Sequence, residues 1–223
     1  MSRAVVIVDY GMGNVMSVRR GLDHCGAETR LTDRADEIVA AERLVLPGVG
    51  AFADCMRALE SRGLVDPLKA FVATGRPFLG ICVGMQILLE IGEEFGGYGG
   101  LGLIAGRVSE IDRQCADGSP RKIPHIGWTP IAPPASAGDD RWNGSILDGS
   151  APGTAFYFVH SFTAVPSDPA DVLAVADYAG AAITAAVQRD NITGVQFHPE
   201  KSGAAGLALL ARLLAIPRKD GKL

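Results

Sequence analysis

Short apolar runs alternate with segments of helical spacing along the first half of the chain. Residues 4–8, AVVIV, are apolar without interruption, which is typical of a strand buried on both faces of a sheet. The same reasoning predicts further strands at 27–32, 43–47 and 77–81, and helices at 14–26, 34–41, 51–63, 64–75 and 83–95. Because strands and helices alternate, we expect a parallel sheet with helices on its faces.

The second half of the chain has a different pattern, with short β-like runs separated by turns. These runs lie at 103–111, 155–162, 172–178, 181–190 and 192–197. An apolar helix is expected at 203–216, and a surface loop at 133–145. The fold class that fits both halves is α/β, with a mixed, largely parallel central sheet and helices on both faces. We expect one domain over residues 1–216, followed by a polar tail at 217–223.

The overall composition argues against several classes of partner. The 223 residues are 48% hydrophobic and 21% charged, and they carry a formal net charge of -4. A surface that grips nucleic acid or an anionic membrane needs clustered Lys and Arg, so we expect neither partner. No apolar run reaches the roughly 18 residues of a membrane span, and the start of the chain lacks a secretory signal. Both observations predict a cytoplasmic protein.

The four cysteines, Cys25, Cys55, Cys82 and Cys115, are far apart in the sequence. They form no Cys-x-x-Cys pair and have no histidine at metal-ligand spacing, so we expect neither disulfides nor structural zinc. Each cysteine is then either a core residue or a reactive thiol, and its local context has to separate the two.

Two glycine-rich segments resemble phosphate-binding loops at first sight. In VDYGMGNVM, which follows the first predicted strand, Met16 replaces the third glycine of the dinucleotide fingerprint, so we favour a structural or partner-facing turn. GYGGLG, at 97–102, has the right spacing but precedes a strand-like run, which leaves no helix N-terminus for a pyrophosphate.

Cys82 lies in the sequence GICVG, between a predicted strand and a predicted helix. This is the form of a nucleophile elbow, in which the flanking glycines remove side chains that would collide with the strand and the helix. The helix N-terminus also favours the thiolate, which is the reactive form. A small buried cysteine at a strand–helix junction is the alternative.

A cysteine nucleophile needs a base, and His198 is the best candidate among the four histidines. It ends the apolar run ITGVQF, and Glu200 follows two residues later, where it could orient the imidazole. A capped turn at His-Pro-Glu is an equally good explanation of this segment alone. His24 falls on a predicted amphipathic helix and is expected at the surface.

Acyl transfer also needs donors for the developing oxyanion. LVLPGVG, at 44–50, places a glycine-rich turn after a predicted strand, and the backbone N–H of Val83 would be the second donor. Taken alone, PGVG is better explained by a tight turn than by an oxyanion site.

Together, GICVGMQ, LPGVG and GVQFHPEKS resemble the class I, or triad, glutamine amidotransferase family. The resemblance covers nearly the whole chain to about residue 216, and it implies a mixed α/β fold and hydrolysis of glutamine without a cofactor or a metal. By that resemblance Cys82 is the nucleophile, His198 moves the proton and Glu200 orients the imidazole of His198. Gly50 and Val83 would stabilise the oxyanion, and four positions match the glutamine site: Gln86, Glu94, Ser161 and Phe162. The family more often has leucine where this chain has Val83.

Three further segments resemble one branch of this family, the glutaminase subunits of imidazole glycerol phosphate synthase. They are DYGMGNVMSV, KIPHIGW and YFVHSF, with HPEKS completing the set. The resemblance implies a heterodimer with a (β/α)8-barrel cyclase subunit, which receives the ammonia through a closed passage. The positions that match the subunit interface are Asn14, Trp128, Tyr157 and Lys201.

Three alternatives remain open from the sequence. The chain could serve another synthase, such as that of anthranilate or pyridoxal phosphate, or it could be a non-catalytic assembly subunit. A thiol protease or esterase on a similar fold would leave the matches to the glutamine site without explanation.

Overall fold

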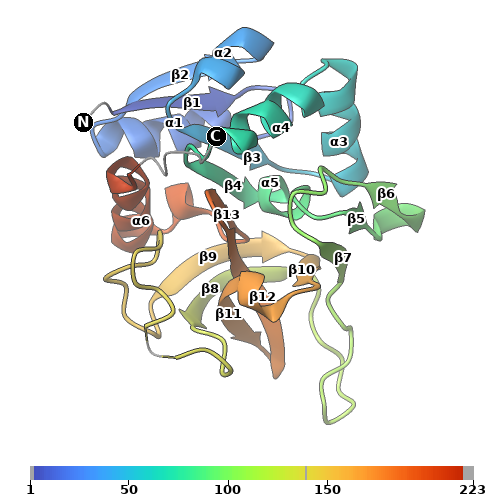
Figure 1. Cartoon of the computed structure of the whole chain (residues 1–223). Coiled ribbons are helices and arrows are strands. Elements are labelled where there is room, and N and C mark those ends of the chain that lie inside the picture. Colours follow the sequence, from blue (N-terminus) through green and yellow to red (C-terminus); the bar gives the residue numbers. More distant parts are fainter. Residues whose placement is uncertain (1–2, 139, 218–223) are drawn as a thin grey trace.

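The computed structural model describes residues 3–138 and 140–217, and a nine-stranded sheet runs through it (Figure 1). The strands occur in the order β2-β1-β3-β4-β13-β12-β11-β8-β9. Their bounds are β1 (Ala4–Val8), β2 (Glu28–Thr32), β3 (Leu44–Gly48), β4 (Phe78–Cys82), β8 (His125–Ala132), β9 (Ala155–His160), β11 (Val172–Tyr178), β12 (Ala181–Arg189) and β13 (Ile192–Val195).

The sheet is parallel from β2 to β13 and antiparallel from β13 to β9. This confirms the predicted mixed sheet, and the strands that pair antiparallel all come from the second half of the chain. All five residues of β3 and of β4 are buried, as expected for central strands covered on both faces. The predicted oxyanion turn begins in β3, and the predicted nucleophile is the last residue of β4.

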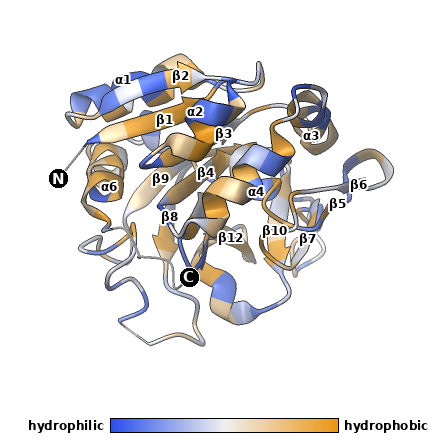
Figure 2. Ribbon diagram, turned by 45° about the horizontal axis from the view of Figure 1, so that its top comes forward, coloured by the Kyte–Doolittle hydropathy of each residue, from blue (hydrophilic) through white to orange (hydrophobic). Residues whose placement is uncertain are grey.

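Helices cover both faces of the sheet. They are α1 (Val15–His24), α2 (Ala35–Ala40), α3 (Phe52–Ser61), α4 (Val65–Ala73), the short α5 (Val83–Gln86) and α6 (Gly203–Ala215). In the structure α1 packs with α6, and α2 packs with α4. Figure 2 shows the apolar residues concentrated on the central strands and the polar residues on outward surfaces such as that of α1. None of the described helices is both long and apolar enough to cross a bilayer.

A second, four-stranded sheet lies beside the first and was not predicted. Its order is β10-β7-β5-β6, with β5 (Ile91–Gly92), β6 (Tyr98–Gly99), β7 (Gly106–Glu110) and β10 (Phe162–Pro166). The described residues also form three short 3-10 helices: η1 (Glu94–Gly96), η2 (Pro169–Asp171) and η3 (Pro199–Lys201). The β-like run expected at 155–162 is therefore two strands in two different sheets, separated at Ser161.

The helix predicted at 83–95 is wrong beyond its first turn, since α5 ends at Gln86. The chain turns after that point, and the Glu90 N–H bonds to the carbonyl of Gly106 in the second sheet. Gly92 packs closely against Phe52, since a Cβ at this position would lie 2.4 Å from the ring. Local apolar spacing favoured a helix, but tertiary packing of a glycine-rich segment overrides it.

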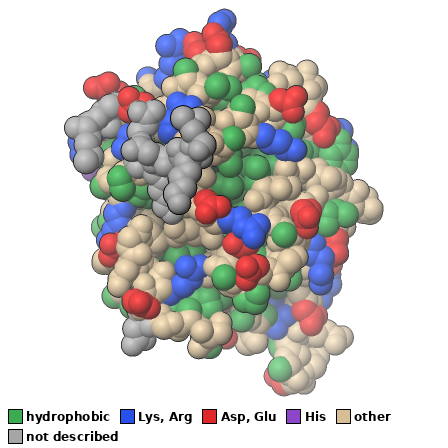
Figure 3. Space-filling view, viewed as in Figure 1, with side chains coloured by type: hydrophobic (Ala, Val, Ile, Leu, Met, Phe, Trp, Pro, Cys, Tyr) green, Lys and Arg blue, Asp and Glu red, His purple; other side chains and the backbone are tan. Residues whose placement is uncertain are grey.

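Strand β8 was also missed, because its sequence HIGWTPIA contains glycine and proline, which weaken a strand signal. The polar tail expected at 217–223 falls outside the described residues from 218 onward, so it stays a prediction. Charged side chains of both signs are interspersed over the face seen in Figure 3, in keeping with the small net charge.

Candidate active site

Cys82 stands at the end of β4, where the chain turns directly into α5. Its backbone has φ of 55° and ψ of -114°, a conformation that side-chain-bearing residues rarely adopt. The flanking glycines are required by space: a Cβ at Gly84 would lie 1.9 Å from the Leu46 carbonyl oxygen, and one at Gly80 would lie 2.5 Å from the Gly84 oxygen. The steric reason for GICVG is thus visible in the structure.

His198 follows the end of β13, the strand that pairs with β4. Its Nδ1 lies 2.8 Å from Oε1 of Glu200, and both side chains are almost completely buried. The backbone of His198 is also fixed, since its N–H donates to the Tyr157 carbonyl and its own carbonyl accepts from the Ser202 hydroxyl. Nε2 of His198 is buried and makes no hydrogen bond to the described residues.

The surroundings of His198 favour its protonated form. Burial alone lowers the pKa of the imidazole, but the interactions with the Cys82 sulfur and the Glu200 carboxylate outweigh it and raise the pKa to about 9. At neutral pH the imidazole therefore carries a proton beside the cysteine. An imidazolium in that place favours a thiolate and can give a proton to a leaving group.

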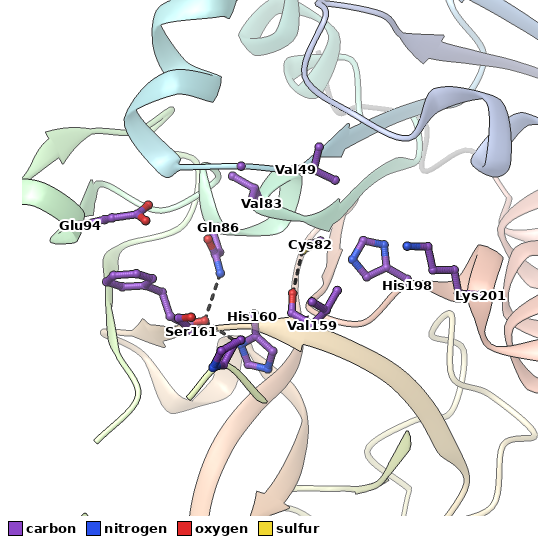
Figure 4. A pocket seen from close by; sticks show the side chains of 13 residues that line it. Val49, Cys82, Val83, Gln86, Glu94, Val159, His160, Ser161, His198 and Lys201 are labelled. Atoms are coloured by element: carbon purple, nitrogen blue, oxygen red, sulfur yellow. Dashed lines mark hydrogen bonds between the residues drawn. The ribbon is translucent and has the colours of Figure 1, made fainter. Parts of the chain in front are cut away.

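A pocket with a volume of about 320 Å³ opens over this pair (Figure 4). It brings together residues predicted from widely separated motifs: Gly50, Cys82, Val83, Gln86, Glu94, Ser161, Phe162, His198 and Lys201. Val49, Pro124, Val159 and His160 complete the lining. In Figure 4, Cys82 and His198 lie on one side of the pocket, and Gln86 and Glu94 lie on the other.

The segment predicted as an oxyanion turn lies next to the cysteine, because Gly48 is the register partner of Cys82. Gly50 has φ of +95° and lines the pocket. Two buried side chains hold the carbonyls of this segment, with the Tyr10 hydroxyl donating to Pro47 and the Cys55 thiol donating to Val49 at 3.5 Å. Sequence reasoning did not find either support.

Cys55 is unsuited to be a second nucleophile. Burial raises the pKa of its thiol to about 11, so the thiol stays neutral at physiological pH. Together with the hydrogen bond to Val49, this assigns Cys55 to the packing behind the turn.

At each of the four positions matched to the glutamine site, a polar group already forms a hydrogen bond within the protein. Nε2 of Gln86 donates to the Phe162 carbonyl at 3.1 Å, so these two groups bind each other. One carboxylate oxygen of Glu94 accepts from the Phe52 N–H at 2.9 Å, and the Ser161 carbonyl accepts from the Ile111 N–H. All four matched residues line the pocket, and their contacts to a substrate remain a prediction.

Three of the four positions matched to a subunit interface form one cluster. Trp128 packs edge-on against Tyr157, with ring centroids 6.2 Å apart, and the Lys201 ammonium lies 6.0 Å from the Tyr157 ring. Trp128 is 56% exposed. Asn14 is placed separately, where it caps α1 through a hydrogen bond from the Ser17 N–H, and α1 packs against η3.

Buried polar groups that the sequence analysis did not single out lie beneath the pocket. Gln196 is completely buried, and its Nε2 lies 3.7 Å from Cys82 Sγ. The signal that could have found it is strand alternation, since residues 196 and 198 should share a face. A pair of buried histidines, His125 and His160, adjoins the pocket, with Nδ1 of the first 3.0 Å from Nε2 of the second and Nδ1 of the second 2.8 Å from the Phe162 carbonyl.

Comparison with known proteins identifies the family of this chain. Residues 6–215 match the model of the family "Glutamine amidotransferase class-I". Two solved structures have the same fold. "Crystal structure of glutamine amidotransferase" matches with a TM-score of 0.66 and 18% identity, over 95% of this chain and 99% of that one. "Structure of PurLQS from Thermotoga maritima" matches with a TM-score of 0.68 and 18% identity, over 96% of this chain and 98% of that one. The chain belongs to the class I glutamine amidotransferase family.

Relatives with higher identity define the branch. The chain is 46% identical to "Imidazole glycerol phosphate synthase subunit HisH 1" of Legionella pneumophila (strain Lens), over 96% of this chain and 99% of that protein. It is also 46% identical to "Imidazole glycerol phosphate synthase subunit HisH" of Syntrophotalea carbinolica, over 92% of this chain and 97% of that protein. Within the family, the chain groups with the HisH subunits.

Proposed function

We propose that this chain is the glutaminase subunit of imidazole glycerol phosphate synthase, an enzyme of histidine biosynthesis, and that it acts in the cytoplasm. It hydrolyses L-glutamine to glutamate and ammonia and passes the ammonia to a cyclase subunit. The observation that carries the proposal is the meeting of Cys82, His198 and Gln86 in one pocket, with Glu200 2.8 Å behind the imidazole. The HisH names of relatives at 46% identity support the choice of synthase.

The first half of the reaction forms a thioester. The Cys82 thiolate attacks the side-chain carbonyl carbon of glutamine, and the carbonyl oxygen becomes an oxyanion. Backbone N–H groups of Gly50 and Val83, which both line the pocket, are the proposed donors to that oxygen. When the tetrahedral intermediate collapses, His198 gives its proton to the departing nitrogen, and ammonia leaves.

The second half releases glutamate. His198, now neutral, takes a proton from water, and the resulting hydroxide attacks the thioester carbon. Collapse expels the Cys82 thiolate, and the cycle ends with the starting ion pair. Glu200 keeps Nδ1 of the ring protonated, so that Nε2, which has no other hydrogen bond among the described residues, is the nitrogen that exchanges the proton.

The proposed partner is a (β/α)8-barrel cyclase subunit in a heterodimer, which uses the ammonia to form imidazole glycerol phosphate and aminoimidazole carboxamide ribotide. Free ammonia is mostly protonated at neutral pH and then loses its nucleophilicity, which gives a physical reason for direct transfer. The proposed contact is the cluster of exposed Trp128 and Lys201 with half-buried Tyr157, because Lys201 also lines the pocket. The turn that holds Asn14 is proposed as a separate part of the contact, on the side of η3 where α1 packs. We expect glutamine hydrolysis to rise sharply when the cyclase and its ribotide ligand are bound.

The deciding experiment is Cys82→Ala in the complex with the cyclase. Glutamine-dependent synthesis of imidazole glycerol phosphate should be abolished, while synthesis from added ammonium salts should persist, because the cyclase accepts ammonia directly. Loss of both activities would show that Cys82 is structural. Parallel assays with the anthranilate and pyridoxal phosphate synthases test the other amidotransferase assignments, and ammonia transfer to either of these would overturn the present one.

A further inference from the structure

Gln196 is a buried residue that contacts the proposed nucleophile but has no role in the mechanism proposed so far. Its side chain is 0% exposed, and Nε2 is 3.7 Å from Cys82 Sγ, within the range of a weak hydrogen bond to sulfur. Gln196 continues β13, where its N–H donates to the Ala185 carbonyl at 2.9 Å. It is therefore held by the sheet, as His198 is two residues later.

The orientation of the Gln196 amide is set by its second partner. Gln86 Nε2 donates to Gln196 Oε1 at 2.9 Å, so the oxygen end is occupied and the NH₂ end faces the sulfur. Gln86 is itself oriented, because the same Nε2 also donates to the Phe162 carbonyl. Rotating the Gln196 amide would place its NH₂ group against the NH₂ group of Gln86 and its oxygen against the Cys82 thiolate. Both hydrogen bonds would then be lost.

Two buried histidines fix the Phe162 carbonyl from its other side. His160 Nδ1 donates to it at 2.8 Å, which leaves His160 Nε2 as the acceptor for His125 Nδ1, and Thr129 Oγ1 then donates to His125 Nε2 at 2.7 Å. The donors therefore all run from Thr129 toward Phe162, with both imidazoles neutral. This arrangement allows one orientation of Gln86, and through it one orientation of Gln196.

The contacts of Cys82 Sγ show why such a donor matters. The other hydrogen bond of the thiol to the described residues is with the Val159 carbonyl, at 4.0 Å, and a carbonyl oxygen repels a thiolate. An amide N–H attracts it. Unlike His198, an amide neither gains nor loses a proton near neutral pH, so it can donate to sulfur before and after the proton has moved.

We propose that Gln196 is a further catalytic residue, which stabilises the Cys82 thiolate by donating a side-chain hydrogen bond to Sγ. The inference rests on the proposed role of Cys82 as nucleophile. It assigns Gln86 a second task, that of orienting Gln196, in addition to its place in the glutamine pocket.

The test measures thiolate formation without glutamine, so that it can fail independently of the glutaminase assignment. The full chain is treated with iodoacetamide between pH 6 and pH 10, and modification of the Cys82 peptide is followed by mass spectrometry. In Gln196→Met, which keeps the volume but removes the donor, alkylation at pH 7 should slow about tenfold, the effect of losing one hydrogen bond to a charged group. At pH 10, which is above the ordinary pKa of a thiol, the rates of the variant and the wild type should converge.

Gln196→Glu sharpens the comparison, because a carboxylate in this place repels a thiolate and should slow the reaction at pH 7 further. Thr193→Val, on the same buried strand, is the matched control and should behave as wild type. Equal slowing at pH 7 and pH 10 would indicate a general loss of structure, and wild-type rates in Gln196→Met would overturn the proposal.

A measurement on the unaltered protein covers the case in which the variants do not fold. With ¹⁵N-labelled glutamine side chains, the Gln196 amide signal should move as Cys82 titrates, and it should stay in place in Cys82→Ala. An amide signal that ignores the titration of Cys82 contradicts the proposed bond.

Discussion

Glu200 Oε1 lies 2.8 Å from His198 Nδ1, and the two side chains are only 1% and 4% exposed. The carboxylate is therefore a buried counter-charge for the imidazole. Together with Cys82, it raises the pKa of His198 to about 9 in spite of burial. This relationship makes the pH dependence of glutamine hydrolysis a direct probe of the site.

We expect Glu200→Gln to shift the alkaline limb of the pH profile. The active form needs a protonated His198, so the rate should fall as pH rises through its pKa of about 9. Removing the negative charge lowers that pKa, and the limb should move down by about one to two pH units. The measurement is kcat/KM for glutamine from pH 6 to pH 10 in the complex with the cyclase.

Glu37→Gln is a suitable control, since Glu37 lies on α2 and pairs with Arg30 and Arg34 at the surface. Its profile should match that of the wild type. An unchanged alkaline limb in Glu200→Gln would show that this carboxylate does not set the protonation of His198.

The backbone of Cys82 predicts an effect on stability that is separate from catalysis. At φ of 55° a side chain is strained, whereas glycine adopts this conformation readily. Cys82→Gly should therefore be more stable than Cys82→Ala by about 1 kcal/mol, although neither can form the thioester. Urea unfolding of both variants under one set of conditions measures the difference, and equal midpoints would indicate that the elbow stores no strain.

The buried pair His125 and His160 predicts a loss of stability in mild acid. Burial lowers the pKa of each imidazole to about 4, whereas the unfolded chain titrates near the ordinary value of 6.5. Between these values the unfolded state binds more protons, so the stability is fully present above about pH 6.5 and is lost as the pH falls toward 4. Urea midpoints at pH 7, 6 and 5 should decrease in that order.

A double variant of this pair, His125→Gln with His160→Gln, should be less stable at pH 7 but should lose less between pH 7 and pH 5. His24→Gln, at an exposed position on α1, should keep the wild-type pH dependence. If the wild-type midpoint does not change from pH 7 to pH 5, the pair is not held neutral by the fold.

Trp128 predicts the strength of the subunit contact. It is 56% exposed and packs against Tyr157, so Trp128→Ala removes a large apolar surface without opening the core. We expect the affinity for the cyclase to fall about 10- to 30-fold, as for an aromatic side chain at the centre of an interface. Val39→Ala, at an exposed position on α2, is the control. Isothermal titration of each variant with the cyclase measures the change, and equal affinities would place the contact elsewhere.

The most accurate predictions from the sequence were those that depend on the sterics or the hydrophobicity of a single short segment. GICVG predicted the elbow at Cys82 because only glycine fits on either side of the turn, and the structure shows both close approaches. Continuous apolar runs predicted β1, β3 and β4 within one residue, since such runs are buried on both faces of the sheet. The helix predicted at 83–95 is wrong beyond Gln86, because contacts with residues outside the segment determine its conformation there.

The sequence by itself determined the strands β1 to β4, the elbow and the residue types needed for acyl transfer, because these depend on local sterics and local hydrophobic periodicity. The tertiary structure alone decided which of them meet. His198 reaches Cys82 because β13 pairs with β4, although 116 residues separate the two in the chain. The supports beneath the site, Gln196 and the His125–His160 pair, follow from contacts between different strands. No local pattern records such contacts, since hydrogen-bond partners are chosen by distance in space and not by spacing in sequence.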